Sequence, residues 1–168
     1  MRTGIRLGVD VGTVRVGLAA SDPDGILATP VETIERDVES GSDLGVIADV
    51  VRERHVLEVV VGLPRSLSGE EGPAARGARR YATVLAVQIS PTPVRLIDER
   101  LSTIDAHRTL RDSGVPGRAQ RAVVDQAAAV LILQTALDAE KSSGLAPGEL
   151  VGKRKERAAR TKPKGSRR

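Results

Sequence analysis

Three acidic residues, Asp10, Glu99 and Asp125, stand out because each lies in or close after an apolar segment. Asp10 ends the apolar run of residues 5–10, and Glu99 follows the run of residues 94–97. Asp125 lies among valines and alanines in a stretch with helical periodicity. A charge that is taken out of water needs a partner. A metal ion or a phosphate opposite these carboxylates would supply one.

Three acids that converge from separate elements suit a hard divalent cation such as Mg²⁺ or Mn²⁺. Such ions bind through oxygen and leave positions for water and substrate. Two ions about 4 Å apart can activate a water and stabilise the leaving oxygen of a phosphodiester. In this hypothesis Asp10 bridges both ions, while Glu99 and Asp125 each hold one side. Without metal, the acids would repel one another and a phosphate.

Each acid also has an ordinary structural interpretation. Asp10 precedes a glycine-containing turn and could accept hydrogen bonds from its own backbone. Glu99 could form a surface ion pair with Arg100 or Arg95. Asp125 could pair with Arg121, four residues earlier on the same helix. The joint placement of the three acids, rather than any one of them, favours a shared site.

Four further residues are candidate contacts for a phosphate backbone. Thr13 and Arg15 follow Asp10 in and after the turn, Arg65 lies in a polar loop, and Arg100 follows Glu99 directly. Surface salt bridges are an equally good interpretation of the arginines. Asp98 is a candidate fourth acid. The two histidines, His55 and His107, have no partner at useful spacing and are expected to face solvent.

The composition excludes several kinds of chemistry. The 168 residues include no cysteine, which excludes disulfides, thiolate zinc sites and a cysteine nucleophile. Tyr81 is the single aromatic residue, so stacking of bases on aromatic rings is not expected. There is neither a signal-peptide pattern nor an apolar run of about 20 residues. The sequence therefore predicts a cytoplasmic protein with no membrane association.

The net charge of +4 is unevenly distributed. Residues 151–168 hold nine Lys or Arg and one acid, a charge of +8, which leaves −4 for the preceding residues. We expect one domain over residues 1–141 and a basic, disordered tail over residues 142–168. The tail is either a solvated tether or a salt-sensitive attachment to nucleic acid.

Hydrophobic periodicity predicts an α/β fold with a five-stranded mixed sheet and helices on its faces. Three antiparallel strands are expected to be followed by two parallel ones, and Pro30 indicates a sheet edge or an irregularity. The expected strands cover residues 5–10, 15–21, 26–34, 56–62 and 94–97. The expected helices are one that starts at Ser42 and carries Leu44, Ile47, Val50 and Val51 on one face, and those over residues 73–88, 102–114 and 119–139. If the first and last strands are adjacent and parallel, Asp10 and Glu99 face one cleft.

Four segments resemble, in order, the motifs of the YqgF-like family, nucleases of precursor 16S ribosomal RNA also described as Holliday-junction-resolvase-like. The segments are GVDVGTVRVGLA (residues 8–19), VVGLP (60–64), DERLST (98–103) and DQAAAVLILQ (125–134). The resemblance implies a ribonuclease-H-like fold and a cytoplasmic nuclease that matures the 5′ end of 16S ribosomal RNA. By position, Asp10, Glu99 and Asp125 match the family's acidic residues. The loop PRSLSG (64–69) departs from the family pattern, which more often has an uncharged residue after the proline and an Asp before the glycine.

Three alternatives remain open. The turn after Asp10 also resembles the phosphate-binding turn of actin-like and sugar-kinase ATPases, but those proteins need two lobes to enclose a nucleotide. A second alternative is a nuclease-like scaffold that binds RNA or a transcription partner without cutting it. A third is a resolvase that cleaves branched DNA. The sequence leaves open whether the protein is a monomer or a homodimer.

Overall fold

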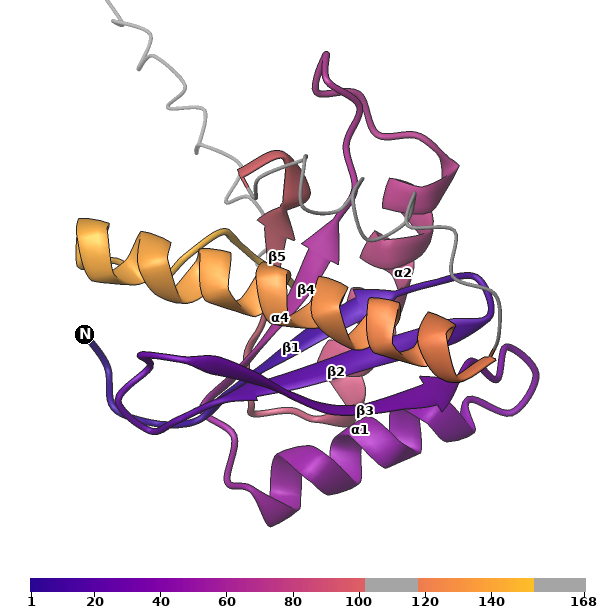
Figure 1. Cartoon of the computed structure of the whole chain (residues 1–168), viewed down its shortest axis with the longest axis horizontal. Coiled ribbons are helices and arrows are strands. Elements are labelled where there is room, and N and C mark those ends of the chain that lie inside the picture. The colour runs from indigo at the N-terminus through magenta and orange to yellow at the C-terminus, as the bar shows by residue number, and fades with distance from the viewer. Residues whose placement is uncertain (102–117, 153–168) are drawn as a thin grey trace, which may run out of the picture.

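The computed structural model describes residues 1–101 and 118–152. It has one six-stranded sheet with the order β3-β2-β1-β4-β5-β6 (Figure 1). The strands are β1 (Arg6–Val11), β2 (Arg15–Ser21), β3 (Ala28–Glu35), β4 (Glu58–Leu63), β5 (Val94–Asp98) and β6 (Glu149–Leu150). The helices are α1 (Ser42–Glu53), α2 (Pro73–Gln88), the 3₁₀ turn η1 (Glu99–Leu101) and α4 (Arg118–Ser143).

The helices cover the sheet on both faces (Figure 1). α4 lies across β1, β2, β3 and β4 on one face, which we call the α4 face, and α1 and α2 lie on the other. Side chains alternate between the faces of a strand. Leu7 and Val9 of β1 therefore pack in the core beside α1 and α2, whereas Gly8 lies under Leu133 of α4.

The expected antiparallel meander is confirmed. β1 pairs with β2 and β2 with β3, all antiparallel, while β1–β4 and β4–β5 are parallel. Pro30 lies on the edge strand β3 opposite Ala19, where the register shifts between Leu18 and Ala19. Both features expected of a proline in a sheet, an edge and an irregularity, therefore occur together.

The sheet has six strands rather than the five predicted, because the chain continues past α4 to form β6. β6 pairs antiparallel with β5, and the amide of Val151 donates to the carbonyl of Val94. Gly148, at φ +68°, lies so close to the carbonyl of Leu96 that a side chain would not fit. Residues 142–152, which we assigned to a disordered tail, therefore include the end of α4 and the strand β6. The basic residues from 153 onward and the helix expected over 102–114 lie outside the described residues.

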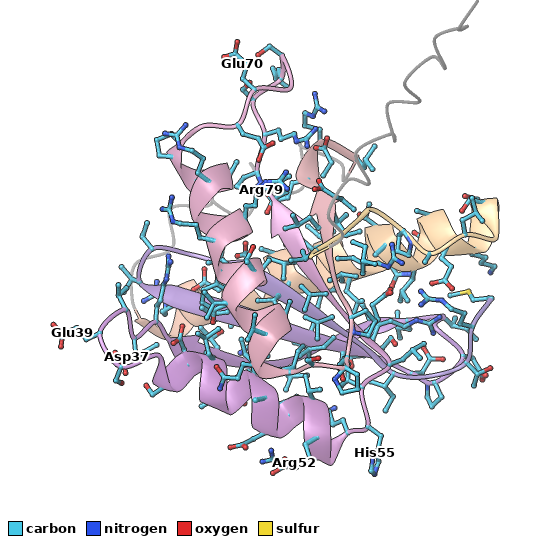
Figure 2. All side chains as sticks on the ribbon, turned by 180° about the vertical axis from the view of Figure 1, so that it is seen from behind. Asp37, Glu39, Arg52, His55, Glu70 and Arg79 are labelled. Carbon is cyan, nitrogen blue, oxygen red and sulfur yellow. The ribbon has the colours of Figure 1, made fainter. Side chains whose placement is uncertain are left out.

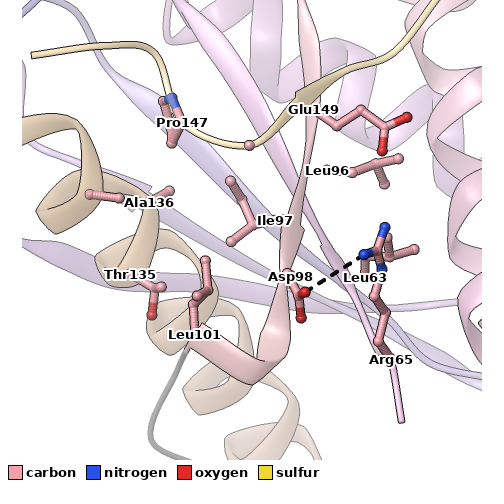
Figure 3. A pocket seen from close by; sticks show the side chains of 12 residues that line it. Leu63, Arg65, Leu96, Ile97, Asp98, Leu101, Thr135, Ala136, Pro147 and Glu149 are labelled. Carbon is pink, nitrogen blue, oxygen red and sulfur yellow. Dashed lines mark ion pairs between the residues drawn. The ribbon is translucent and has the colours of Figure 1, made fainter. Parts of the chain in front are cut away.

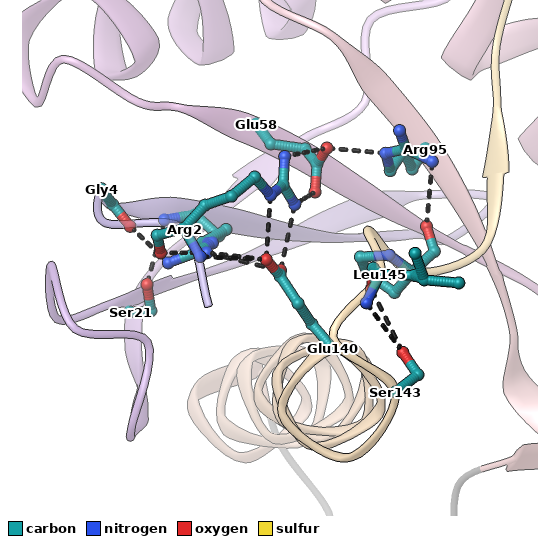
Figure 4. A network of polar contacts seen from close by, with 10 residues as sticks. Arg2, Gly4, Ser21, Glu58, Arg95, Glu140, Ser143 and Leu145 are labelled. Atoms are coloured by element: carbon teal, nitrogen blue, oxygen red, sulfur yellow. Dashed lines mark hydrogen bonds and ion pairs between the residues drawn. The ribbon is translucent and has the colours of Figure 1, made fainter.

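A buried cluster of charges joins the N-terminus to the end of α4 (Figure 4). Arg2 bonds both Glu58 and Glu140, with nitrogen–oxygen distances of 2.9 Å to each, and Arg6 bonds Glu140 at 3.3 Å. Glu58 also accepts a 2.7 Å bond from Arg95. The hydrogen bonds from Arg2 lower the pKa of Glu140 to about 2. Buried charges persist where such partners compensate for the lost water.

No helix among the described residues is long and apolar enough to cross a membrane.

Candidate active site

Asp10 lies near the end of β1, which is the neighbour of β2 in the sheet. It follows Gly8 by two residues. Gly8 contacts α4, so strand alternation places Asp10 on the α4 face as well. In the β1–β2 register Asp10 is opposite Gly17. The turn between these strands is closed by the amide of Gly12, which donates to the carbonyl of Arg15 at 2.9 Å.

Asp125 reaches the same place from α4. Its backbone carbonyl lies where a Cβ on Gly17 would be, so any side chain at that position would push the helix away from the sheet. Gly17 is also the register partner of Asp10. One glycine therefore brings the α4 backbone at Asp125 down onto the strand that is paired with Asp10.

Glu99 lies in η1, directly after β5. Our expectation depended on β1 and β5 being adjacent, and this is wrong because β4 lies between them. The intervening residue is Gly62, and its missing Cβ would lie 2.5 Å from Glu99 Oε1 and 2.5 Å from Ile132 of α4. Because Gly62 has no side chain, the Glu99 carboxylate extends over β4 on the α4 face. It reaches toward the strand that carries Asp10.

The Asp125 side chain is held by Arg15. Arg15 Nε lies 2.9 Å from Asp125 Oδ2, and each side chain is 25% exposed. We predicted these two residues separately, one as a metal ligand and the other as a phosphate contact, and the pair joins β2 to α4. The side chain of Arg121, the other partner considered for Asp125, lies outside the described residues. Asp10 and Glu99 also have polar or electrostatic partners in the structure.

The donor set fits a hard divalent cation in its chemistry, because all three side chains offer carboxylate oxygens. The space over Gly62, which a Cβ would fill, holds a carboxylate oxygen of Glu99. Within residues 1–101 and 118–152, however, no three acidic or histidine side chains lie close enough together to hold a metal ion. Asp125 faces Arg15 in this arrangement. A three-acid metal site would therefore require at least one of these side chains to move.

Asp98 belongs to a different cluster from Glu99. It follows Leu96 by two residues, on the side of β5 that packs with α1 and α2. Its carboxylate accepts a 2.6 Å bond from Arg100 Nη2, and Arg65 Nη1 lies 3.9 Å away. Hydrogen bonds from Arg100 lower the pKa of Asp98. These contacts satisfy Asp98 without a metal, so its placement does not support a role as a fourth ligand.

The other predicted phosphate contacts differ in how exposed they are. Thr13 is exposed in the β1–β2 turn. Arg65 lies between Asp98 and Glu71, whose carboxylate is 3.6 Å away. Arg100 lies beside Gly69, whose missing Cβ would be 3.1 Å from Arg100 Nη1. The two arginines thus hold the loop of residues 64–72 against the end of β5.

That loop projects from the carboxyl ends of β4 and β5, with Glu70 at its tip and His55 exposed at the opposite end of the molecule (Figure 2). Arg79 of α2 braces the loop by bonding Glu71 at 2.9 Å and Glu149 of β6 at 2.8 Å. A cavity of about 150 Å³ lies below the loop, between β5 and α4, with Asp98 and Arg65 at its rim (Figure 3).

Three glycines that line the α4 face, Gly8, Gly17 and Gly62, were not among the predicted site residues. Each would clash with α4 or with Glu99 if it carried a Cβ. The available signal was a glycine inside each of three otherwise apolar strands, since a glycine within a strand often marks a close approach of another backbone.

A family model described as RuvX, Holliday junction resolvase, matches residues 4–139. That match covers most of the chain and includes Asp10, Glu99 and Asp125. The chain belongs to the RuvX family. Its members include many sequences with the name "Putative pre-16S rRNA nuclease". As a member of this family the protein is a nuclease, a hydrolase of phosphodiester bonds in nucleic acid.

Two RuvX relatives illustrate the similarity. The protein from Nocardioides sp. is 57% identical over 153 residues, which cover 90% of this chain and 98% of the relative. The one from Streptomyces coelicolor is 56% identical over 152 residues and covers 90% of each chain. Among solved structures, Thermus thermophilus RuvC in complex with a Holliday junction substrate superposes with a TM-score of 0.54 at 15% identity. It covers 88% of this chain and 99% of RuvC, which confirms the ribonuclease-H-like fold.

Proposed function

We propose that this RuvX-family protein is a metal-dependent endonuclease that matures precursor 16S ribosomal RNA in the cytoplasm, as a monomer or a homodimer. The proposal is supported by two contacts on the α4 face: Asp10 and the backbone of Asp125 both meet Gly17, and Glu99 Oε1 lies over Gly62 of the neighbouring strand β4. The names of relatives that match nearly their full length support the RNA substrate.

Asp10, Glu99 and Asp125 are the residues that would hold Mg²⁺ or Mn²⁺, and we propose two ions with Asp10 shared between them. The bound ions would lower the pKa of an attacking water and stabilise the leaving oxygen. The chain's own contribution is to orient the carboxylates: Gly62 admits the Glu99 carboxylate, and Gly17 sets the height of Asp125. Arg15, which contacts Asp125, and Thr13, Arg65 and Arg100 are the residues that we propose orient the phosphate backbone.

The test is cleavage of precursor 16S RNA in the presence of Mg²⁺, Mn²⁺ or a chelator, with Asp10→Asn as the active-site variant. We expect cleavage that needs metal and that falls by at least about 100-fold in the variant, because the bridging carboxylate is lost. Asp49→Asn is the matched control, since Asp49 is exposed on α1 and pairs with Arg52. Full activity of Asp10→Asn, or unchanged cleavage with chelator, would reject the assignment.

Branched DNA is the second candidate substrate, and the family description as Holliday junction resolvase favours it. The same assay with a four-way DNA junction separates the two substrates. We expect faster cleavage of the RNA. Faster, symmetric cleavage of the junction by a dimer would assign the protein as a resolvase, and binding of RNA with no metal-dependent cleavage would indicate a binding module.

A further inference from the structure

The ion pair between Arg15 and Asp125 joins two residues that have different roles in the proposed reaction. Arg15 opens β2 on the α4 face, and its Nε lies 2.9 Å from Asp125 Oδ2. Both side chains are 25% exposed, so each can change rotamer at the edge of the site without disturbing the core. The backbone of Asp125 is fixed separately by its contact with Gly17.

This pair does not hold α4 on the sheet. That role belongs to the apolar cluster of the α4 face, where Ala129, Ile132 and Leu133 are almost fully buried. Partly exposed ion pairs contribute little to stability. The position of Arg15 is therefore better explained by its charge next to a group of acids than by a structural role.

A guanidinium and a divalent cation compete for the same carboxylate oxygen. In the absence of metal, Arg15 offsets the mutual repulsion of the acids. Once a doubly charged ion binds, the arginine beside it becomes unfavourable, because the two positive charges repel each other. A phosphate is the alternative partner that an arginine binds best, through its planar fork of donors.

We propose that Arg15 is an exchangeable counter-ion that occupies Asp125 until metal binds and then transfers to the phosphate of the bound nucleic acid. The proposal rests on the proposed function, because it needs Asp125 to be a metal ligand. In this scheme Arg15 is a positioning residue before metal binds, since it holds the Asp125 carboxylate. Afterwards it orients substrate. Loading of metal and binding of nucleic acid are therefore coupled.

The first test measures Mn²⁺ affinity by calorimetry, without substrate, for the wild-type chain, Arg15→Gln, Asp10→Asn and the control Arg52→Gln. Arg52 also pairs with an aspartate, Asp49, but on exposed α1. If Arg15 occupies Asp125 in about nine molecules of ten, its removal raises Mn²⁺ affinity about tenfold, because affinity scales with the competent fraction. At saturating Mn²⁺, Arg15→Gln should bind nucleic acid more weakly than wild type.

The outcomes separate this proposal from the one on which it rests. If wild type and Asp10→Asn bind Mn²⁺ equally, the metal site itself is wrong. If Asp10→Asn weakens binding as expected but Arg15→Gln binds Mn²⁺ no more tightly than wild type, the metal site stands and the exchange is rejected.

A second measurement uses the intact chain, which covers the case in which Arg15→Gln does not fold. The Nε–H resonance of Arg15 is followed by NMR during titration with diamagnetic Mg²⁺, with Asp125→Asn as the reference. Exchange predicts that Mg²⁺ moves the wild-type resonance toward the position it has in Asp125→Asn. A resonance that stays in place at saturating Mg²⁺ would overturn the proposal.

Discussion

Two glycines, Gly17 and Gly62, determine which atoms can reach the α4 face of the sheet. Gly17 admits the backbone of Asp125, and Gly62 admits the carboxylate of Glu99. An active site is usually described by the side chains that do the chemistry. Here the positions of Asp125 and Glu99 depend equally on Gly17 and Gly62, which have no side chains.

The first prediction at this scale concerns Gly62→Ala. The added methyl group would lie 2.5 Å from both Glu99 Oε1 and Ile132 Cδ1, so the carboxylate or α4 must move. We expect the free energy of unfolding to fall by about 1–3 kcal/mol, as for other overpacked sites. Metal-dependent cleavage should fall by more than this loss of folded protein explains. Chemical denaturation and cleavage assays on the same preparation measure both.

Gly45→Ala is the control, because a Cβ on Gly45 of α1 would meet nothing within 4 Å. It should leave cleavage unchanged and slightly stabilise the helix. Wild-type cleavage by Gly62→Ala at temperatures where it is folded would show that Glu99 does not need the space over β4.

The three candidate acids could be found from sequence because each is a charge beside apolar neighbours. Their partners could not, because partners depend on the order of strands. Sequence spacing could not suggest that Arg15, 110 positions away, contacts Asp125. Likewise Asp98 and Glu99 are adjacent in sequence, yet one pairs with Arg100 while the other extends over Gly62.

At the scale of elements, α4 connects two different polar sites. Near its start Asp125 meets Arg15, and near its end Glu140 meets Arg2 and Arg6. Between them the helix packs on the sheet mainly through apolar side chains, and Gln134 bonds the backbone of Ile26 and Ala28. The periodicity of α4 predicted its existence and type, as it did for α1 and α2. Periodicity could not predict the buried charges of the second site. Apart from Arg6 and Glu58, the runs that contain these two residues look like ordinary apolar core strands.

The second prediction concerns the pH dependence of this buried cluster. The pKa of Glu140 is lowered from 4.5 to about 2 in the folded chain. A lowered pKa stabilises the folded state above the unfolded value, and that stability is lost as the pH falls from about 4.5 through about 2. The shift corresponds to roughly 3 kcal/mol. Urea denaturation between pH 2 and pH 7 should show this loss for the wild-type chain.

The variant that isolates the effect is Glu140→Gln, which removes the titrating group. It should be less stable at pH 7 by about 3–5 kcal/mol, because Arg6 is left buried with an incomplete set of partners. It should also lose less stability than wild type between pH 5 and pH 2. Glu39→Gln, at an exposed position between β3 and α1, serves as the control. If the stability of Glu140→Gln depends on pH in the same way as that of wild type, the acid sensitivity comes from other carboxylates.

At the scale of the whole molecule, the amino-acid composition does not show where the fold ends and the basic tail begins. Small and polar residues from Ser142 to Gly148 indicated a tail, but the chain goes on to pair with β5. Tertiary contacts explain the difference, since Gly148 fits under Leu96 and Glu149 pairs with Arg79. The change in charge occurs later, from residue 153.

The third prediction separates these two boundaries with two truncations. A chain that ends at Gly152 keeps β6, so its thermal unfolding should match that of the full chain. A chain that ends at Ser143 loses β6 and the bond from Arg79 to Glu149, and exposes the edge of β5. We expect its unfolding midpoint to fall by several degrees, about 2–4 °C for each kcal/mol lost in a domain of this size. Equal midpoints for the two truncations would mean that β6 contributes nothing to stability.

The same pair of chains tests what the tail does, because the chain ending at Gly152 is missing a charge of +8 and keeps −4 on the folded part. Counter-ion release adds about 0.7 to the logarithmic salt slope for each cation that contacts a phosphate of single-stranded nucleic acid. If the tail attaches substrate, the truncation should weaken RNA binding at low salt and flatten its salt dependence. Cleavage by saturated enzyme should stay the same, because the acids lie within residues 10–125. An unchanged salt slope would mean that the phosphate contacts come from the folded part alone. In that case Thr13, Arg15, Arg65 and Arg100 would attract the RNA although the folded part has a negative net charge.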